Sequence, residues 1–593
     1  LVGSEMCIRD RHRMSQQSFD FVIVGGGSAG AVIAARLSED RSCRVALLEA
    51  GQRPPDLELI PVQCAAMQKD PATDWMYTAD PGRAGLGLNG RRIPVPRGKM
   101  LGGSSGINYM AYVRGHPGDF DAWADGGATG WSYAEVLPYF RKSERLAPCE
   151  SVAIDPDAHG TSGPLGVCVR SPVLRGAREF VAAAEAAGIP QGDYNGRDRG
   201  GPAGAVSLMQ TSTAAGKRSS TYRAFLEGAV EQRPNLTILT GAHATRVLLS
   251  ESLRATGVEY RTADGATHVA SAAKEVVLCA GAVGSPHLLL LSGIGPRAEL
   301  AAAGVRCLLD APHVGKHLQD HLQVPLFFPA AASGVPMNDV TRALEDECAM
   351  DAWRTTGNGL MASSLYDAAA WFSTGLGDPH SHDAQIGFIP SGYSFELWHT
   401  LLNVDTAQYF GDAARHLAAD ARSILVLANP VLPHSEGEIV LESADPDVHP
   451  AIRMNYYGEP HDLKVVVAVL RRALDIMAHW PKGSSLGPWL VPPALAAKHG
   501  YQEGTAPSDA LLEDLALHFS ITVYHLSCTC RIGDVVDPQL RVLGMEALRV
   551  ADASVMPRVV SGNTNAASIM IGERAAELIA AAHGVALTEV VGR

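Results

Sequence analysis

The sequence predicts an α/β fold with a doubly wound, Rossmann-type sheet, and its first fifty residues carry the evidence. An apolar run at residues 19–24 leads into a glycine turn, a helix-length segment rich in alanine comes next, and a second apolar run ends at Glu49. The turn has the pattern Gly25-x-Gly27-x-x-Gly30. Strand, glycine turn, helix and strand in this order are typical of a βαβ unit that binds a dinucleotide.

The residues of this unit indicate how a dinucleotide would be held. The three glycines, with Ser28 inside the turn, permit a close approach to a pyrophosphate, and the helix N-terminus offers free N–H groups and a positive dipole end. Glu49 stands nineteen positions after Gly30, where a carboxylate accepts the hydroxyls of an adenosine ribose. An acid there suits FAD or NAD and repels the 2′-phosphate of NADP, so FAD and NAD both remain open.

Composition bounds the class of protein. The 593 residues are 46% hydrophobic and 19% charged, which is typical of a globular protein with a large core. A net charge of −14 without any basic run argues against a nucleic-acid partner. No apolar run reaches the ~18 residues of a membrane span. Ten scattered cysteines predict no disulfide framework and a reducing, cytoplasmic compartment.

The beginning of the chain differs in character from the rest of the sequence. The first thirteen residues lack an apolar core of signal-peptide length. Met14 and the polar residues after it make a natural start just before the first strand. We therefore interpret residues 1–14 as a tail or an artefact without function.

The rest of the chain divides into two interleaved domains that differ in their pattern of glycine turns, strands and helices. Glycine turns between apolar strands and helices recur at 276–295 and from residue 522 to a final helix at 566–582. Between them, strands at 423–432 and 437–443 and helices at 461–480 and 508–519 predict an α+β domain on an antiparallel sheet. We assign 15–150, 216–324 and 520–593 to the cofactor domain, and 151–215 and 325–519 to the substrate domain.

Local patterns predict further elements. A helix is expected near 133–145, and residues 150–215 look like short strands separated by turns. The alternating segments 243–249 and 257–262 predict a hairpin.

Three motifs far apart in the sequence give the chain a family resemblance. They are GKMLGGSSGINYMAYVRG at 98–115, GAVGSPHLLLLSGIG at 281–295, and the pair YHLSCTCRIG at 524–533 with SGNTNAASIMIGE at 561–573. Together with the unit that ends at Glu49, they resemble the glucose–methanol–choline (GMC) oxidoreductases, a family of flavoproteins. The resemblance runs from residue 19 to about residue 579 and implies FAD in place of NAD.

The resemblance also implies which residues contact FAD. The polar turn at 98–108 is a backbone nest of the kind that holds anions, and in the family it runs along the pyrophosphate and flavin. Some relatives have a histidine bonded covalently to FAD where this chain has Ile107, so we predict a non-covalent FAD. For Asp552, the alternative to a contact with FAD is a structural role in a turn or as a helix cap. The contacts expected beyond the first unit are Arg97, Gly102, Gly103, Ser104, Asn108, Ala244, Asp552, Ala553 and Thr564.

Two residues are expected to carry the chemistry. Oxidation of an alcohol removes a proton and a hydride; the resemblance implies that flavin N5 takes the hydride, and a histidine suits the proton. His525 matches the family's catalytic histidine, and Asn563 matches the partner that binds the alkoxide oxygen. The alternatives are a buried structural histidine and, for Asn563 and Asn565, helix N-caps. A helix that begins here would direct its positive end at the flavin.

We therefore expect an FAD-dependent dehydrogenase or oxidase that converts a primary alcohol into an aldehyde. Redox-neutral or light-driven chemistry on this scaffold, as a lyase or a fatty-acid decarboxylase, is an alternative. A choline-specific dehydrogenase is another, because residues 528–530 resemble choline dehydrogenase-like members. Leu526 replaces the family's usual proline and Ile532 its usual methionine, which leaves the substrate open.

The sequence does not identify the partners of the reaction. The electron acceptor is dioxygen, a quinone or a carrier protein, and a quinone would place the enzyme at a membrane surface. The oligomeric state is open. A choline substrate would need a carboxylate or an aromatic cage, and the aromatic residues in question are Trp371, Tyr393, Phe395 and Trp398.

A histidine series could suggest a metal. His313, His317 and His321 are spaced four apart, as on one face of a metal-binding helix. The family has a VG-x-x-LQDH segment in this region and no metal, so we predict no metal site.

Overall fold

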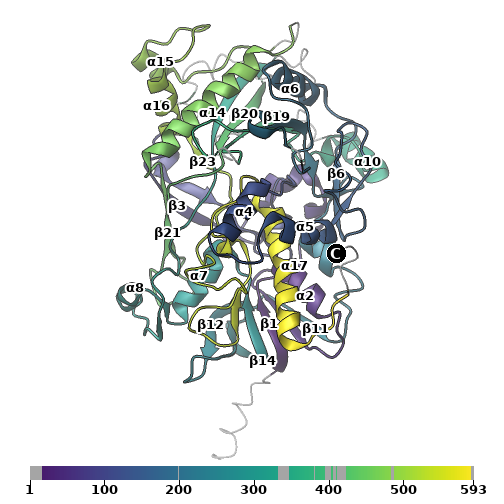
Figure 1. The fold of residues 1–593 in the computed structure, drawn as a ribbon, viewed down its shortest axis with the longest axis vertical. Coiled ribbons are helices and arrows are strands. Elements are labelled where there is room, and N and C mark those ends of the chain that lie inside the picture. Colours follow the sequence, from purple (N-terminus) through teal and green to yellow (C-terminus); the bar gives the residue numbers. More distant parts are fainter. Residues whose placement is uncertain are drawn as a thin grey trace, which may run out of the picture.

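The computed structural model describes residues 17–197, 199–330, 346–378, 381–393, 403–404, 409, 422–482 and 486–588. Two β-sheets with their helices lie one above the other along the long axis of the molecule (Figure 1). The predicted tail at 1–14, and Phe395 and Trp398, lie outside the described residues.

The lower sheet in Figure 1 has seven strands in the order β11-β2-β1-β14-β13-β12, with β24 paired to β14. The pairs among β11, β2, β1, β14 and β24 are parallel, whereas β12, β13 and β14 form antiparallel pairs, so the predicted hairpin is confirmed. The strands are β1 Gln17–Val24, β2 Val45–Glu49, β11 Leu236–Thr240, β12 His243–Leu249, β13 Ala255–Arg261, β14 Thr267–Leu278 and β24 Leu548–Val550.

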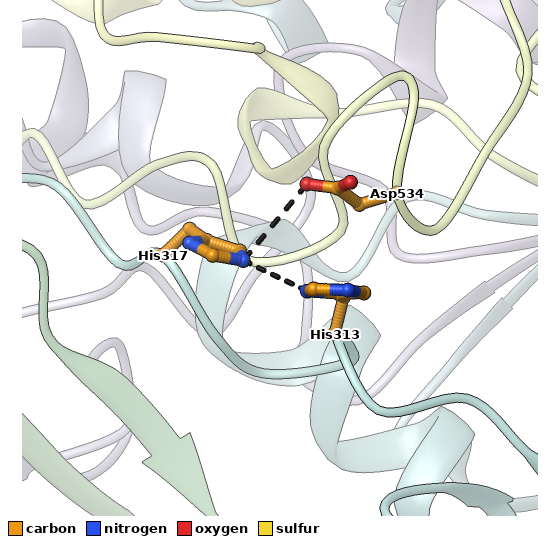
Figure 2. A group of neighbouring side chains, drawn as sticks. All are labelled: His313, His317 and Asp534. Atoms are coloured by element: carbon orange, nitrogen blue, oxygen red, sulfur yellow. Dashed lines mark hydrogen bonds and ion pairs between the residues drawn. The ribbon is translucent and has the colours of Figure 1, made fainter.

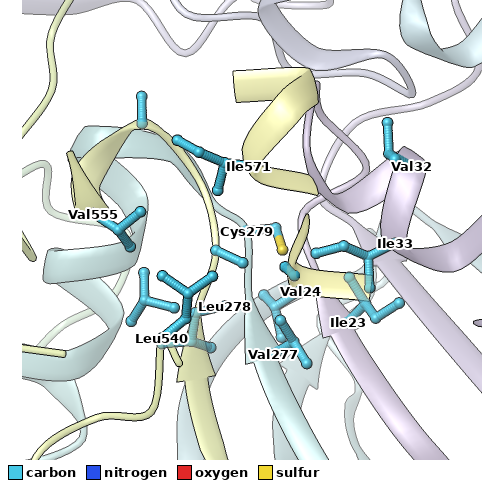
Figure 3. Close-up of a cluster of buried hydrophobic side chains, with 14 of the residues drawn as sticks. Ile23, Val24, Val32, Ile33, Val277, Leu278, Cys279, Leu540, Val555 and Ile571 are labelled. Carbon is cyan, nitrogen blue, oxygen red and sulfur yellow. The ribbon is translucent and has the colours of Figure 1, made fainter. Parts of the chain in front are cut away.

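The helices α2 (Gly30–Leu37) and α17 (Thr564–His583) lie side by side against this sheet (Figure 1). Parallel strands covered on both faces are apolar throughout, which explains the continuous runs in the sequence. Ile23, Leu278 and Ile571 are among the fully buried side chains of this core (Figure 3). Each such side chain contributes about 1.5–3 kcal/mol through burial, so the predicted βαβ unit assembles around its own apolar residues.

Glycine is required at two points of the first turn. A Cβ on Gly25, whose φ is +100°, would lie 2.4 Å from the carbonyl oxygen of Cys279. A Cβ on Gly30 would lie 1.9 Å from the carbonyl oxygen of Gly25. The ends of β1 and β14 and the start of α2 therefore meet at one edge of the sheet, which no other residue type would allow.

The upper sheet has six strands in the order β23-β17-β20-β19-β18-β7, and every pair in it is antiparallel, as predicted. Its strands are β7 Ala205–Leu208, β17 Leu322–Ala330, β18 Ala368–Phe372, β19 Ala384–Tyr393, β20 Arg422–Pro430 and β23 Ile521–Thr522. The predicted helices beside it are confirmed as α14 (Pro460–Ala478) and α16 (Asp509–Phe519).

One helix of this layer was not expected. Residues 150–215 were predicted as short strands, but α6 occupies Arg175–Ala186 within them. It buries Phe180, Val181 and Ala184 on one face, which is the pattern of an amphipathic helix. The prediction was wrong here because turn residues on both sides obscured a single three-turn helix.

The two predicted domains share a smaller sheet. Strands β3 (Tyr77–Gly82) and β4 (Ile93–Val95) pair with β22 (Ala451–Tyr456) and β21 (Glu438–Val440) in the order β21-β22-β3-β4. This sheet joins segments that the sequence assigned to different domains, and the domain division stays a prediction.

Three further predictions concern helices and cysteines. The helices α5 (Tyr133–Ser143) and α7 (Gly281–Leu291) lie where the sequence indicated helices. Nine cysteines fall in the described part of the chain, and all of them are free. Among the helices in that part, none has both the length and the apolar character needed to cross a bilayer.

Candidate active site

Two adjoining cavities lie where the parallel strands of the lower sheet end, which is the usual ligand position in such sheets. The glycine-lined cavity is bordered by the first turn, Glu49 and the end of β14; the apolar cavity is bordered by β19, β20 and the start of α17. The two share Ser28, Arg97, Ser104, Ala553 and Ser568.

The glycine-lined cavity collects most of the predicted cofactor contacts. Its walls include Gly25, Gly27, Ser28, Glu49, Arg97, Gly103, Ser104, Ala244, Asp552 and Ala553. Gly30 and Gly102 are not among its lining residues. Gly30 instead packs against Gly25, and Gly102 donates its backbone N–H to the carbonyl of Gly26.

Bare backbone forms the centre of this cavity. A Cβ on Gly103, whose φ is +50°, would lie 2.7 Å from the Cα of Gly27, so two glycine turns from distant parts of the chain are in contact. Such a surface lets a phosphate group approach backbone N–H groups without side-chain interference.

Glu49 is held rigidly at one end of the cavity. Its two carboxylate oxygens accept hydrogen bonds of 2.8 Å from the backbone N–H groups of Gly26 and Gly51. Burial raises the pKa of Glu49 to about 7, although these hydrogen bonds act in the opposite direction. Its side chain is therefore oriented before any ligand arrives.

Asp552 connects three elements beside the cavity. It caps the short helix at Ala553–Val555 by accepting a hydrogen bond of 2.8 Å from Ser554 N–H, and its second oxygen accepts from Gly281 N–H at 2.8 Å and from the hydroxyl of Ser285. The sequence left cap and cofactor contact open as alternatives; Asp552 caps the helix and also lines the cavity.

Sequence reasoning missed the aromatic end of this cavity. Trp75, Tyr77, His243, His287 and His449 all line it. The rings of Trp75 and His243 are 5.5 Å apart, and those of Tyr77 and His449 are 4.6 Å apart. Except for His287 in the motif at 281–295, these residues belong to no motif. Of the others, only His243 could have been found from the sequence, because it is next to Ala244, a predicted cofactor contact.

The apolar cavity is lined mostly by uncharged side chains. The described residues that line it include no carboxylate, and Arg97 is their only guanidinium. Asn108 and Thr564, both predicted as cofactor contacts, lie here. The apolar part of its wall includes Ile107, Tyr109, Met110, Leu365, Tyr366, Ile389, Leu425, Leu427 and Val523.

His525 and Asn563, the two predicted catalytic residues, meet in this cavity. Asn563 Nδ2 is 3.2 Å from His525 Nε2. His525 lies just after β23, and its backbone N–H donates a 2.7 Å hydrogen bond to Asp320 Oδ1. The other oxygen of Asp320 accepts from the hydroxyls of Tyr456 and Thr522, so the carboxylate that binds the backbone of His525 is itself held in place.

A second histidine supports the ring of His525. The Nδ1 atoms of His321 and His525 are 2.9 Å apart, and the rings are perpendicular. With Asn563 donating to Nε2, neutral His525 carries its proton on Nδ1 and donates it to His321. Burial lowers the pKa of His525 well below its usual value and the pKa of His321 to about 4, so both rings are neutral at pH 7.

The start of α17 completes this wall. Asn563 is the N-cap residue of the helix, but its side chain makes no capping hydrogen bond, because its amide lies against His525. Asn565 lies inside the first turn and accepts a 2.7 Å hydrogen bond from the hydroxyl of Ser28, so the alternative of an N-cap role for Asn565 is wrong. The positive end of a twenty-residue helix therefore borders the cavity.

Two other predictions concern residues away from the cavities. Trp371 stacks on Tyr194 with ring centroids 4.2 Å apart and lines neither cavity. The spacing of His313 and His317 is that of one helix face, but the two residues lie in a loop, and His317 has a positive φ of 62°. His321 is separated from them and belongs to the pair with His525.

Comparison with known proteins agrees with this geometry. Models of the GMC oxidoreductase family match residues 19–323 and 433–572. An alcohol dehydrogenase [acceptor] from Pseudomonas putida is 35% identical over 576 residues, which is 95% of either chain. An oxygen-dependent choline dehydrogenase from Ectopseudomonas mendocina is 36% identical over 581 residues, covering 95% of this chain and 94% of that one.

Solved structures show the same architecture. Pyridoxine 4-oxidase from Mesorbium loti has a TM-score of 0.75 and 30% identity, over 94% of this chain and 98% of that one. A formate oxidase variant from Aspergillus oryzae RIB40, studied for FAD modification, has a TM-score of 0.79 and 26% identity, over 96% and 99%. The fold and site thus define an α/β oxidoreductase. The chain belongs to the GMC oxidoreductase family, and with alcohol and choline dehydrogenases among its relatives it is a flavoprotein oxidoreductase that acts on CH–OH donors.

Proposed function

We propose that this chain binds FAD without a covalent bond and oxidises uncharged, apolar primary alcohols to aldehydes, with His525 as the proton acceptor. The observation that carries the proposal is the contact between His525 Nε2 and Asn563 Nδ2 in a cavity that adjoins the glycine-lined one. A base and a hydrogen-bond donor for the same oxygen atom are what the removal of a hydroxyl proton requires.

The glycine-lined cavity supports FAD as the cofactor. The contact between Gly27 and Gly103 leaves backbone exposed for a pyrophosphate, and the buried carboxylate of Glu49 suits ribose hydroxyls. Arg97, Ser104 and Ala553 border both cavities, where the reactive end of the cofactor would lie. Ile107 has no nucleophilic atom, which supports dissociable FAD; acid precipitation should release all of the yellow flavin into the supernatant.

The residues of the apolar cavity explain how the proton would move. Neutral His525 has its lone pair on Nε2, so a substrate hydroxyl placed there gives its proton to the ring. Asn563 Nδ2 donates to the same substrate oxygen and holds it in position. His321 accepts from His525 Nδ1 and stabilises the imidazolium that forms. Bound FAD supplies the hydride acceptor.

The lining of the apolar cavity favours an uncharged substrate. A quaternary ammonium needs a carboxylate or an aromatic cage. The described lining offers three tyrosines, Tyr109, Tyr366 and Tyr524, but no carboxylate, and the guanidinium of Arg97 would repel a cation. The relatives include both an alcohol dehydrogenase and a choline dehydrogenase at nearly the same identity, so they do not discriminate between the two substrate classes. We therefore favour apolar alcohols over choline.

Anaerobic mixing with a panel of alcohols tests the proposal. Benzyl alcohol and 1-hexanol should bleach the flavin. Choline should be poorer by about 100-fold or more in kcat/KM, because an unpaired cation loses several kcal/mol on desolvation. Comparable bleaching by choline would exclude the proposed substrate class.

Two further outcomes of the panel are informative. Admitting air afterwards distinguishes an oxidase from an enzyme that needs a quinone or carrier protein. A yellow protein that no alcohol reduces would instead support the redox-neutral or light-driven alternatives.

A further inference from the structure

A group of metal-ligand side chains lies outside both cavities. His313 and His317, in the loop before β17, and Asp534, after the segment that contains His525, point toward one another (Figure 2). His313 Nδ1 is 2.9 Å from His317 Nε2, and His317 Nε2 is 3.9 Å from Asp534 Oδ2. The three potential ligand atoms lie within 4.8 Å of one another.

These separations are close to those of a tetrahedral metal site. With zinc–nitrogen and zinc–oxygen bonds of about 2.0–2.2 Å, ligand atoms on one ion lie roughly 3.3 Å apart. Two of the separations, 2.9 and 3.9 Å, differ from this value by roughly 0.5 Å, and the third is at most 4.8 Å. Two imidazole nitrogens and a carboxylate oxygen are a donor set that suits Zn²⁺.

The surroundings of His317 strengthen this interpretation. Its second ring nitrogen, Nδ1, is 2.6 Å from Glu436 Oε2, so the ring is held by a carboxylate while Nε2 faces the other ligands. Metal-bound histidines commonly have this partner, which fixes the tautomer and raises the basicity of the ligand. Arg531 pairs with both Asp534 and Glu436 and holds the two carboxylates in place.

The charge and exposure of the group also suit a cation. The two carboxylates of Glu436 and Asp534 outnumber the single guanidinium of Arg531, which pairs with both of them. The His317 and Asp534 side chains are 19% and 29% exposed, which leaves a path from solvent.

We propose that His313, His317 and Asp534 bind one Zn²⁺ ion per chain, with water in the remaining position. The proposal departs from the expectation, based on the family resemblance, that no metal is bound. The fold supplies Asp534, which the sequence did not connect with these histidines.

The ion would join the two segments that hold His525. Gly315 N–H donates to Thr529 O at 2.9 Å, and Gln319 and Ser527 form an antiparallel bridge. Asp320 then binds the backbone of His525 at the far end of the same pairing. A zinc ion at the opposite end would stabilise this pairing and take no part in the chemistry.

Zinc titration of the metal-stripped, tag-free holoenzyme tests the proposal. Calorimetry should detect one zinc per chain that His313→Asn, His317→Asn and Asp534→Asn each remove. Glu436→Gln should weaken that zinc by about 10-fold, because the ring of His317 loses its partner. Zinc should raise the Tm of the wild type, since it binds the folded chain alone, and should leave the Tm of His317→Asn unchanged.

The exposed His479, which comes directly after α14, supplies the matched control. His479→Asn should bind zinc as the wild type does, with the same rise in Tm. FAD content and metal-free Tm verify that each variant is folded, and Asp534→Asn replaces any histidine variant that is not. Zinc affinity equal to the wild type in folded His317→Asn and Asp534→Asn, or a wild type that binds no zinc, would overturn the proposal.

Discussion

The glycine-lined cavity and the apolar cavity adjoin, yet the chain builds them in different ways. Backbone turns from contiguous motifs form the first, with Gly27 and Gly103 in contact at its centre. Side chains from β19, β20 and separate loops form the second. The comparison suggests that cofactor binding depends on the conformation of a few glycines, whereas substrate choice depends on side chains that can change without altering the fold.

The largest effect is expected at His525. His525→Ala should lower the rate of flavin reduction by about 10²–10⁴-fold, because the alcohol proton loses its acceptor. FAD content should stay near that of the wild type, since His525 lines only the apolar cavity. Anaerobic stopped-flow measures the rate, and His479→Asn is the control. A reduction rate within a few-fold of the wild type would mean that another group takes the proton.

The next largest effect is expected in the glycine-lined cavity, on the binding of FAD. In Gly27→Ala the added Cβ meets no protein atom closer than 3.8 Å, so the chain should fold, but the methyl group enters the glycine-lined cavity. FAD affinity should fall by about 10–100-fold, in line with the usual cost of overpacking. Flavin absorbance per folded protein measures this.

A glycine in a helix supplies the control for that change. Gly176→Ala in α6 meets its nearest atom, on Pro390, at 3.4 Å, which is an ordinary contact, and Gly176 lines neither cavity. Its FAD content should equal that of the wild type. Full FAD occupancy in Gly27→Ala would contradict the proposed position of the pyrophosphate.

A smaller effect is expected in the apolar cavity. Leu427→Ala should shift the preference between short and long alcohols by about 10-fold toward the longer ones, because the removed methyl groups leave room in the substrate pocket. Val426, on the opposite face of the same strand, is fully buried and does not line the cavity. Val426→Ala should lower stability and leave the ratio of kcat/KM values unchanged.

The smallest effect concerns pH and stability. Burial lowers the pKa of His321 and of His287 to about 4, whereas both titrate near 6.5 when unfolded. As pH falls below 6.5, the unfolded chain binds protons that the folded chain does not, so stability is lost. Between pH 7 and 5.5 each histidine should remove about 1 kcal/mol from the free energy of unfolding.

Denaturant unfolding across this pH range measures the effect. His321→Gln should reduce the dependence on pH, whereas His479→Asn, at an exposed position, should leave it unchanged. A wild-type stability that does not fall between pH 7 and 5.5 would show that these rings are protonated in the folded protein.

The roles of His525 and Asn563 were inferred from the family resemblance. The βαβ unit was predictable from the sequence itself, because local patterns of glycine and apolar residues determine it. The helix α6 was missed for a local reason as well, since the turns on either side obscured its apolar face. In these cases the information lies within one segment of the chain.

Other features required the tertiary structure. His321 supports His525 across 204 positions of sequence, and Asp534 approaches His313 and His317 from another segment. The aromatic end of the glycine-lined cavity and the apolar wall of its neighbour come from strands, loops and the helix α7, all far apart in the sequence. Sequence alone determined the backbone turns that hold a dinucleotide, because glycine's freedom is a local property. The fold decided which distant side chains meet, because packing between layers brings them together.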